Sequence, residues 1–485
     1  MKHSLLFSLL GATILSSSAA LAAPSTINKS DMGVGDFTVL STSGINGSQN
    51  VIQGGSGNYA QENDNGSGNT DTGVGYTITQ NGQQNLAIVD KEGDNNKSAI
   101  YQLGSQNQAY LYQTGSGMYA SIVEAGTDLN ALIVHQNGAS DALVINEYGT
   151  RQGYTLTATG TNINVGATQQ GSIDAVALQA IGTNMYLGSN QNAIGSHYVG
   201  NFQGNNITSN AIQNGGANSE VINALAQNSG VYVTQTGSQN NSEQDIENNG
   251  TPSSGDYQNI SQSGGGNYAK EVIVSGSGDT GINSTPSNVT NTIIQNGDAN
   301  YAFSAKNGSN ETDLIYQSGV NNVSTLLQSG NMLTANIQQV NSGNNAYVQE
   351  TGSNINVSIN QQASAPNNSY TALVAGANIT LTGKQVGGGN VANVSLWGNN
   401  VVANVGQWGT NNNLQLTSSD ANNVNLTASQ SGVGDKITAT IYGSGTTANI
   451  SQNGNNDTAT VYSTKVNDVI AVSQVGNNMT TTIKH

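Results

Sequence analysis

Polar and apolar residues alternate along short segments of this chain, and evenly spaced glycines separate the segments. In residues 107–113, Asn107, Ala109, Leu111 and Gln113 alternate with a glutamine and two tyrosines. A period of two is typical of a β-strand whose two faces meet different surroundings. The segments are therefore predicted to be strands, each ended by a tight turn.

The glycines recur with a fixed spacing. Gly93, Gly104, Gly115 and Gly126 stand eleven residues apart, and each lies where a turn needs positive φ. An asparagine follows alternate glycines by three residues, which doubles the period to about 22 residues. A repeat this short cannot bury its own apolar face, so its copies must stack. We predict an all-β fold, a parallel β-solenoid of stacked two-strand coils of about 22 residues.

The alternation also predicts that certain amide side chains face inward. A buried amide without a partner costs about 1–3 kcal/mol, but identical amides stacked about 4.8 Å apart donate to one another. We predict that such a buried amide ladder includes Gln80, Asn85, Gln102, Asn107, Gln113, Gln295, Asn300, Gln317, Asn322, Gln328, Gln339, Asn344, Gln385, Asn390, Gln452 and Gln474.

Composition narrows the class of protein. Of 485 residues only 35% are hydrophobic and 8% are charged, the net charge is −17, and there is no cysteine. The acidic balance argues against nucleic acid as a partner, and the missing cysteine excludes disulfides. Stability must come from backbone ladders and small buried side chains.

The order of segments suggests export. Residues 1–22 have a basic start, a short apolar run and a small-residue cleavage site, which predicts a signal peptide; no stretch is long enough to span a membrane. Residues 23–43 are expected to be a flexible leader and residues 44–485 the solenoid. Loops are expected where the phase breaks, near 70–75, 193–203, 241–256, 276–290 and 364–382.

The recurring motif resembles the curlin repeat of bacterial curli. Its clearest copies are Gln102-Leu-Gly104-Ser-Gln-Asn107-Gln-Ala109, Gln295-Asn-Gly297-Asp-Ala-Asn300-Tyr-Ala302 and Gln385-Val-Gly387-Gly-Gly-Asn390-Val-Ala392. The resemblance covers most of residues 44–485. It implies a secreted homopolymer of functional amyloid at the cell surface, a fimbrium for adhesion and biofilm. It also implies a curli-type secretion pore and a nucleator subunit as partners, and contact with host or abiotic surfaces.

Enzymatic chemistry is not expected, and we expect no cofactor or metal. The histidines at 135, 197 and 485 are isolated. Glu311 and Asp313 resemble a polysaccharide-cleaving pair, but solvated carboxylates at the rim are the expected reading. Gly432–Asp435 is a lone fragment of a calcium-binding repeat and is weak evidence for metal.

Two further features concern assembly and surface. Glu124 and Glu147 occupy the closing-glutamine position of successive coils, so stacked like charges should raise at least one pKa and speed assembly in mild acid. Trp397 and Trp408 are expected to face outward. The alternatives to a fibre protein are a monomeric β-solenoid adhesin, an ice-binding solenoid and, last, a polysaccharide-degrading enzyme.

Overall fold

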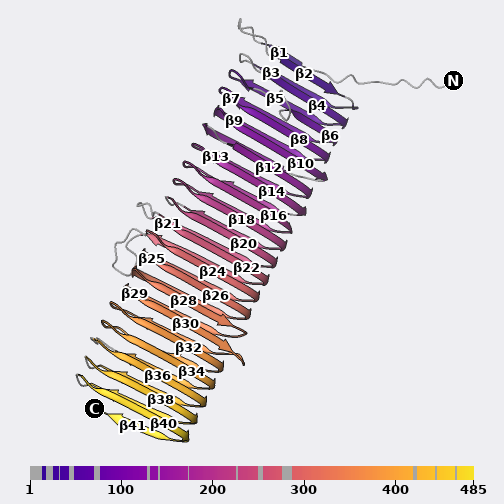
Figure 1. Cartoon of the computed structure of the whole chain (residues 1–485). Helices are drawn as coiled ribbons and strands as arrows, with labels where there is room; N and C mark the ends of the chain where they lie inside the picture. The colour runs from indigo at the N-terminus through magenta and orange to yellow at the C-terminus, as the bar shows by residue number, and fades with distance from the viewer. Residues whose placement is uncertain are drawn as a thin grey trace, which may run out of the picture. The chain divides into compact units, whose positions relative to one another are not determined.

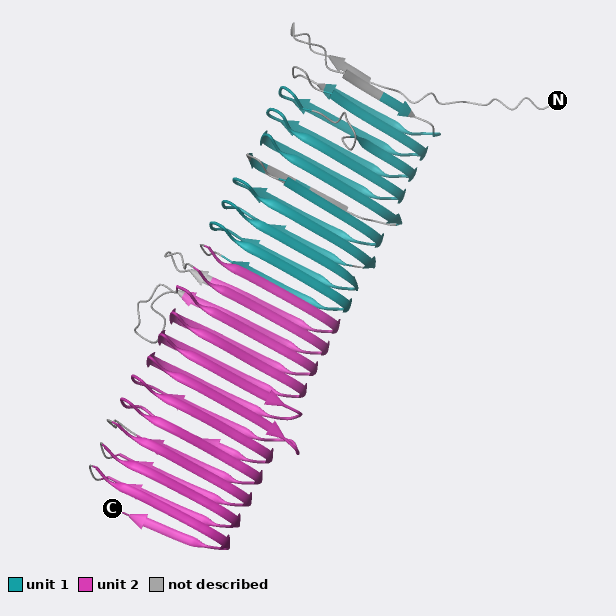
Figure 2. Ribbon diagram, viewed as in Figure 1, with its two compact units in different colours: residues 1–224 teal, residues 225–485 magenta. Residues whose placement is uncertain are grey.

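The computed structural model divides the chain into two compact units, residues 1–224 and 225–485 (Figure 2). It describes residues 14–17, 26–31, 33–42, 48–69, 77–127, 131–139, 142–172, 174–224, 228–248, 255–275, 287–418, 423–442, 445–464 and 467–484. All regular elements in these ranges are β-strands (Figure 1). The predicted all-β fold is confirmed.

In unit 1, the strands alternate between two parallel sheets, so that each coil gives one strand to each. The even-numbered sheet contains β2 (Thr26–Asp31), β4 (Ser48–Ser56), β6 (Ile78–Gln83), β8 (Lys97–Ser105), β10 (Tyr119–Thr127), β12 (Ala142–Thr150), β14 (Asn164–Ser172), β16 (Tyr186–Ile194) and β18 (Thr208–Gly216). The odd-numbered sheet contains β1 (Ile14–Ser17), β3 (Phe37–Thr42), β5 (Tyr59–Asn65), β7 (Leu86–Glu92), β9 (Gln108–Ser116), β11 (Ala131–Ala139), β13 (Gly153–Thr159), β15 (Ala175–Gln179), β17 (His197–Phe202) and β19 (Ser219–Ala224).

Unit 2 repeats this arrangement. Its even-numbered sheet contains β20 (Gly230–Ser238), β22 (Tyr257–Gly265), β24 (Thr290–Asp298), β26 (Thr312–Val320), β28 (Thr334–Val340), β30 (Asn356–Ala363), β32 (Thr380–Gly388), β34 (Val402–Thr410), β36 (Asn425–Val433), β38 (Thr447–Asn455) and β40 (Val469–Asn477). The odd-numbered sheet contains β21 (Asn241–Asn248), β23 (Tyr268–Ser275), β25 (Tyr301–Ser309), β27 (Val323–Asn331), β29 (Asn345–Ser353), β31 (Ser369–Val374), β33 (Val391–Asn393), β35 (Asn413–Ser418), β37 (Lys436–Ile441), β39 (Thr458–Ser463) and β41 (Thr480–Lys484).

The register of the sheets keeps equivalent residues one above another. In unit 2, Gln295 pairs with Gln317, and Gln317 pairs with Gln339, across parallel strands. The core between the two sheets is thin and is filled by small and branched side chains, as at Ala335 and Ile337, which are 2% and 0% exposed. The alternation therefore predicts correctly which residues face inward.

The spaced glycines make the close turns possible. Gly297 has a φ of 125°, and a Cβ added there would lie 2.0 Å from the carbonyl oxygen of Gly319 one coil later. Conformation and space thus both require glycine. Asn321, two residues after Gly319, is also left-handed with a φ of 58°, a conformation that asparagine tolerates better than most residues.

The N-terminal part of the chain differs from the expectation. Of residues 1–22 only Ile14–Ser17 is described, as strand β1, which pairs with β3. Residues 23–43, expected to be a flexible leader, include β2 and β3, which pair with β4 and β5. The ladder continues here without glycine punctuation because Thr38 and Leu40 still alternate inward and are buried.

Three predicted loops are wrong in whole or in part, and others lie outside the described residues. Residues 241–248 form β21, and within 364–382 the strand β31 (Ser369–Val374) separates two short turns. Residues 193–203 belong to regular strands, because Ala193 takes the glycine position between Gly171 and Gly215 without any insertion. Residues 70–76 and 276–286 are not described. Trp397 and Trp408 lie outward as predicted, 42% and 38% exposed.

Candidate functional site

The inward glutamines of unit 2 form one uninterrupted chain of hydrogen bonds, here called the glutamine ladder. Each member before the last, Gln474, donates from Nε2 to Oε1 of the glutamine one coil later, at 2.7–3.0 Å. Every member is buried and ends the inward face of an even-numbered strand. The members are Gln235, Gln262, Gln295, Gln317, Gln339, Gln361, Gln385, Gln407, Gln430, Gln452 and Gln474.

A second bond ties the ladder to the opposite sheet. Gln317 Nε2 also donates to the carbonyl oxygen of Tyr301, and Gln339 Nε2 to that of Val323, both at 2.8 Å. Both hydrogens of each of these amides are therefore used, and Oε1 accepts from the preceding coil. A buried amide so satisfied does not incur the desolvation cost of an unpaired polar group.

The asparagines form a second column at the turn. The backbone N–H of Asn322 donates to Asn300 Oδ1 at 3.0 Å, and that of Asn344 to Asn322 Oδ1 at 3.1 Å. Asn322 Nδ2 donates to Asn300 Oδ1 as well, at 3.1 Å. In unit 1, Asn107 N–H donates to Asn85 Oδ1 at 3.0 Å. Asparagine amides thus bond mainly to backbone, whereas the glutamines bond to one another.

Two aspartates continue this column and were missed by sequence reasoning. Asp435 N–H donates to Asn412 Oδ1 at 3.1 Å, and Asp457 N–H donates to Asp435 Oδ1 at 3.0 Å. Asp435, noted in the sequence as a possible calcium fragment, therefore serves as an acceptor at the turn. The spacing of 23 residues from Asn412 is the signal that points to this role.

Two of the predicted ladder residues lie elsewhere. Gln113 and Gln328 are buried but belong to β9 and β27 in the odd-numbered sheets. Gln328 Nε2 donates to Glu350 Oε2 at 3.1 Å, and Gln113 Nε2 donates to the carbonyl oxygen of Lys97 at 3.3 Å. Neither joins the glutamine ladder, because the closing positions of the odd-numbered strands are not uniformly amides.

The corresponding ladder of unit 1 is interrupted by two glutamates. Gln80 donates to Gln102, and Gln102 Nε2 donates to Glu124 Oε2, each at 2.7 Å. Glu124 stands in register with Glu147, and Glu147 with Gln169. Burial, and then the charge of Glu147, raise the pKa of Glu124 well above its ordinary value. Burial raises the pKa of Glu147 to about 8.

A second group of buried charges lies in unit 2. Lys306 Nζ is 3.2 Å from Asp313 Oδ2, and both side chains are inaccessible to solvent. Glu311 and Glu350 are also buried. Burial raises the pKa of Glu311 to about 8 in spite of Lys306, and raises that of Glu350. The prediction that Glu311 and Asp313 lie at the rim is wrong, since both occupy inward positions of the repeat.

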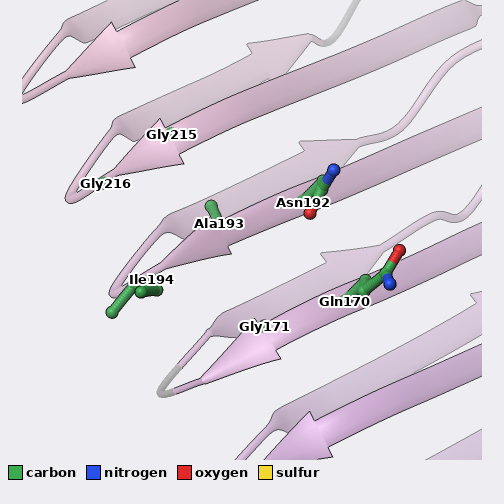
Figure 3. A pocket seen from close by; sticks show the side chains of 7 residues that line it. All are labelled: Gln170, Gly171, Asn192, Ala193, Ile194, Gly215 and Gly216. Atoms are coloured by element: carbon green, nitrogen blue, oxygen red, sulfur yellow. The ribbon is translucent and has the colours of Figure 1, made fainter.

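The described surface of unit 1 is hollowed beside the column of turn glycines. A hollow of about 340 Å³ lies in unit 1 where Ala193 replaces glycine (Figure 3). Its polar side chains are the amides of Gln170 and Asn192, and none of its lining residues titrates. His197 is exposed on β17. Through the described ranges, no group of three or more His, Cys, Asp or Glu side chains is arranged to hold a metal ion.

Two negative findings concern membrane-spanning helices and similarity to known proteins. Within the part of the chain that the structure describes, there is no helix with the length and apolar character needed to cross a membrane. The chain matches no protein-family model and no curated protein.

Proposed function

We propose that this chain is a secreted structural protein that self-assembles into extracellular amyloid fibres of the curli type, which serve cell adhesion and the biofilm matrix. The observation that carries the proposal is the glutamine ladder of unit 2. Each coil is joined to the next by the same backbone and side-chain bonds. A coil of a second molecule has the same groups in the same places, so it can extend the ladder.

The purified mature protein tests the proposal directly. We expect thioflavin fluorescence to rise with time, fibre diffraction to show the spacing of about 4.8 Å between strands, and preformed fragments to shorten the lag. A polypeptide that stays dispersed as a single folded species, even with fragments added, would refute the proposal. That outcome would favour the monomeric adhesin, which has the same fold.

A further inference from the structure

The interruption of the unit 1 ladder leaves four buried oxygen atoms without a hydrogen-bond partner. They are Oε1 of Glu124, both carboxyl oxygens of Glu147, and Oε1 of Gln169. Gln102 donates into this gap from one side, and beyond it Gln169 Nε2 donates to Gln191 Oε1 at 2.9 Å. In the described part of unit 1, the side-chain hydrogen bonds of the ladder are therefore broken only at the two positions where glutamate replaces glutamine.

We propose that Glu124 and Glu147, here called the carboxyl pair, form a two-proton site in which both are held as neutral carboxylic acids that complete the unit 1 ladder. A carboxylic acid has one O–H donor and a carbonyl acceptor, like one N–H and the carbonyl of an amide. Glu124 O–H then donates to Glu147, and Glu147 O–H donates to Gln169 Oε1. Two protons thus give partners to all four unpaired oxygens.

The groups around the carboxyl pair favour protons over a counter-ion. In the opposite sheet, Tyr154 lies seven residues after Glu147, the relation that Ser324 has to Gln317, to which it is hydrogen-bonded. Tyr154 is 2% exposed, its hydroxyl has no partner, and burial raises its pKa, with a further contribution from Glu147. A neutral phenol donates a hydrogen bond but supplies no positive charge.

Among the side chains of the neighbouring strands that the structure describes, no other titrating group faces inward at this level. In the same sheet, β8 and β14 contribute Gln102 and Gln169. In the opposite sheet, the register places Leu132 of β11 beside Ala109 of β9. Arg151, in the turn after β12, is exposed. His135 of β11 pairs in register with Tyr112 and Thr157.

The inference predicts that the folded state of unit 1 binds protons that the unfolded chain has lost. Burial raises the pKa of Glu147 to about 8 from an ordinary value of 4.5. A group with a raised folded-state pKa stabilises fully below its unfolded pKa, and this stabilisation is lost as pH rises through the folded pKa. The unfolding equilibrium constant should therefore rise up to about tenfold per pH unit for each proton, between about pH 4.5 and 8.

The experiment compares the full-length mature protein with the double variant E124Q/E147Q, in which amides replace the proposed acids. We expect the unfolding equilibrium constant of the double variant to rise less steeply with pH than that of the wild type, by up to about tenfold per pH unit for each of the two protons. Other buried acids such as Glu311 contribute the same pH dependence to both proteins. The variant E92Q, which neutralises an exposed carboxyl on β7, serves as the matched control and should retain the wild-type profile. The difference infrared spectrum between wild type and double variant, at neutral pH, should contain the carbonyl stretch of protonated carboxylic acids.

Each outcome decides the matter. Superimposable pH profiles together with an empty difference spectrum would overturn the inference. Stabilisation of the wild type by Ca²⁺ at neutral pH, without the carboxylic acid band, would overturn it in favour of a cation site. The single variants E124Q and E147Q should each lose part of the band, which tests the assignment if the double variant does not fold. None of these measurements requires fibres, so failure of the proposed function would leave the inference standing.

Discussion

Replacing Gln339 with methionine should destabilise unit 2 far more than the same change at its neighbour in sequence. Gln339 is 0% exposed, accepts from Gln317 Nε2 at 2.8 Å, and donates to Gln361 Oε1 at 2.9 Å and to the Val323 carbonyl at 2.8 Å. Methionine has similar volume but cannot form these bonds. Three hydrogen bonds are lost at once.

The size of the loss in free energy of unfolding depends on which hydrogen bonds the partners of Gln339 keep in the variant. Gln317 keeps its bonds to Tyr301 and Ser324, so it loses about 1 kcal/mol. The Gln361 Oε1 atom is left buried without its ladder donor, which costs about 1–3 kcal/mol, and the lost Val323 bond adds about 1 kcal/mol. We expect a decrease of about 2–5 kcal/mol in the free energy of unfolding, after a small gain from the apolar side chain.

The assay is denaturant unfolding followed by tryptophan fluorescence, because both tryptophans of the chain, Trp397 and Trp408, lie in unit 2. The matched control is Gln338→Met on the same strand. Gln338 is half-buried and accepts one bond, from Asn360 Nδ2 at 2.7 Å, so its loss should be below about 1 kcal/mol. Equal losses at the two positions would refute the reasoning.

A double variant gives a sharper test of the ladder. Gln317→Met alone and Gln339→Met alone each leave one ladder donor and one ladder acceptor unpaired. The double variant leaves the same number, since only Gln295 and Gln361 then border the gap. Its cost should fall short of the sum of the single costs by about 1–3 kcal/mol. Strict additivity would contradict the ladder as the source of the effect.

Two further predictions concern other parts of unit 2. Gly297→Ala, at a φ of 125° with its Cβ 2.0 Å from the Gly319 oxygen, should lower the free energy of unfolding by at least about 2 kcal/mol. The control Gly265→Ala, whose Cβ would lie 3.4 Å from its nearest atom, should lower it by less than about 1 kcal/mol. Similar denaturation midpoints for the two variants would contradict this prediction. Lys306→Met removes the buried cation beside Asp313 and should cost about 3–5 kcal/mol at neutral pH, less in acid. Lys270→Met, which breaks a partly exposed pair with Glu243, should cost below about 1 kcal/mol, and the same loss in both lysine variants would argue against a buried charge effect.

Much of the fold could be predicted from the amino-acid sequence because the same pattern of residues recurs in most coils. Inward positions such as Ala109, Leu111 and Ile122 follow from alternation alone, and each is 0% exposed. The glutamine ladder was predictable because register is fixed when a 22-residue period keeps like residues stacked. Glu124 and Glu147 were recognised as neighbours for the same reason.

The errors arose where one position departs from the repeat. Ala193 interrupts the glycine spacing and so predicts a loop, although strand pairing tolerates alanine in the glycine column there. Glu311 and Asp313 were expected in solvent because carboxylates usually are, and only the pairing of Lys306 across the core shows why Asp313 is buried. The placement of Gln113 and Gln328 in the odd-numbered sheets shows that an amide at the right spacing does not make a ladder without amide neighbours.

The direction of the glutamine bonds gives unit 2 a polarity along its stacking axis. In each ladder bond one Nε2–H points toward the following coil, so the aligned amide dipoles polarise one another in one sense. In the fibre proposed above, stacking that continues this direction places the donor end of one ladder against the acceptor end of the next. Head-to-tail contact between subunits related by translation does not close upon itself, so the proposed fibre would be an open filament with two distinguishable tips.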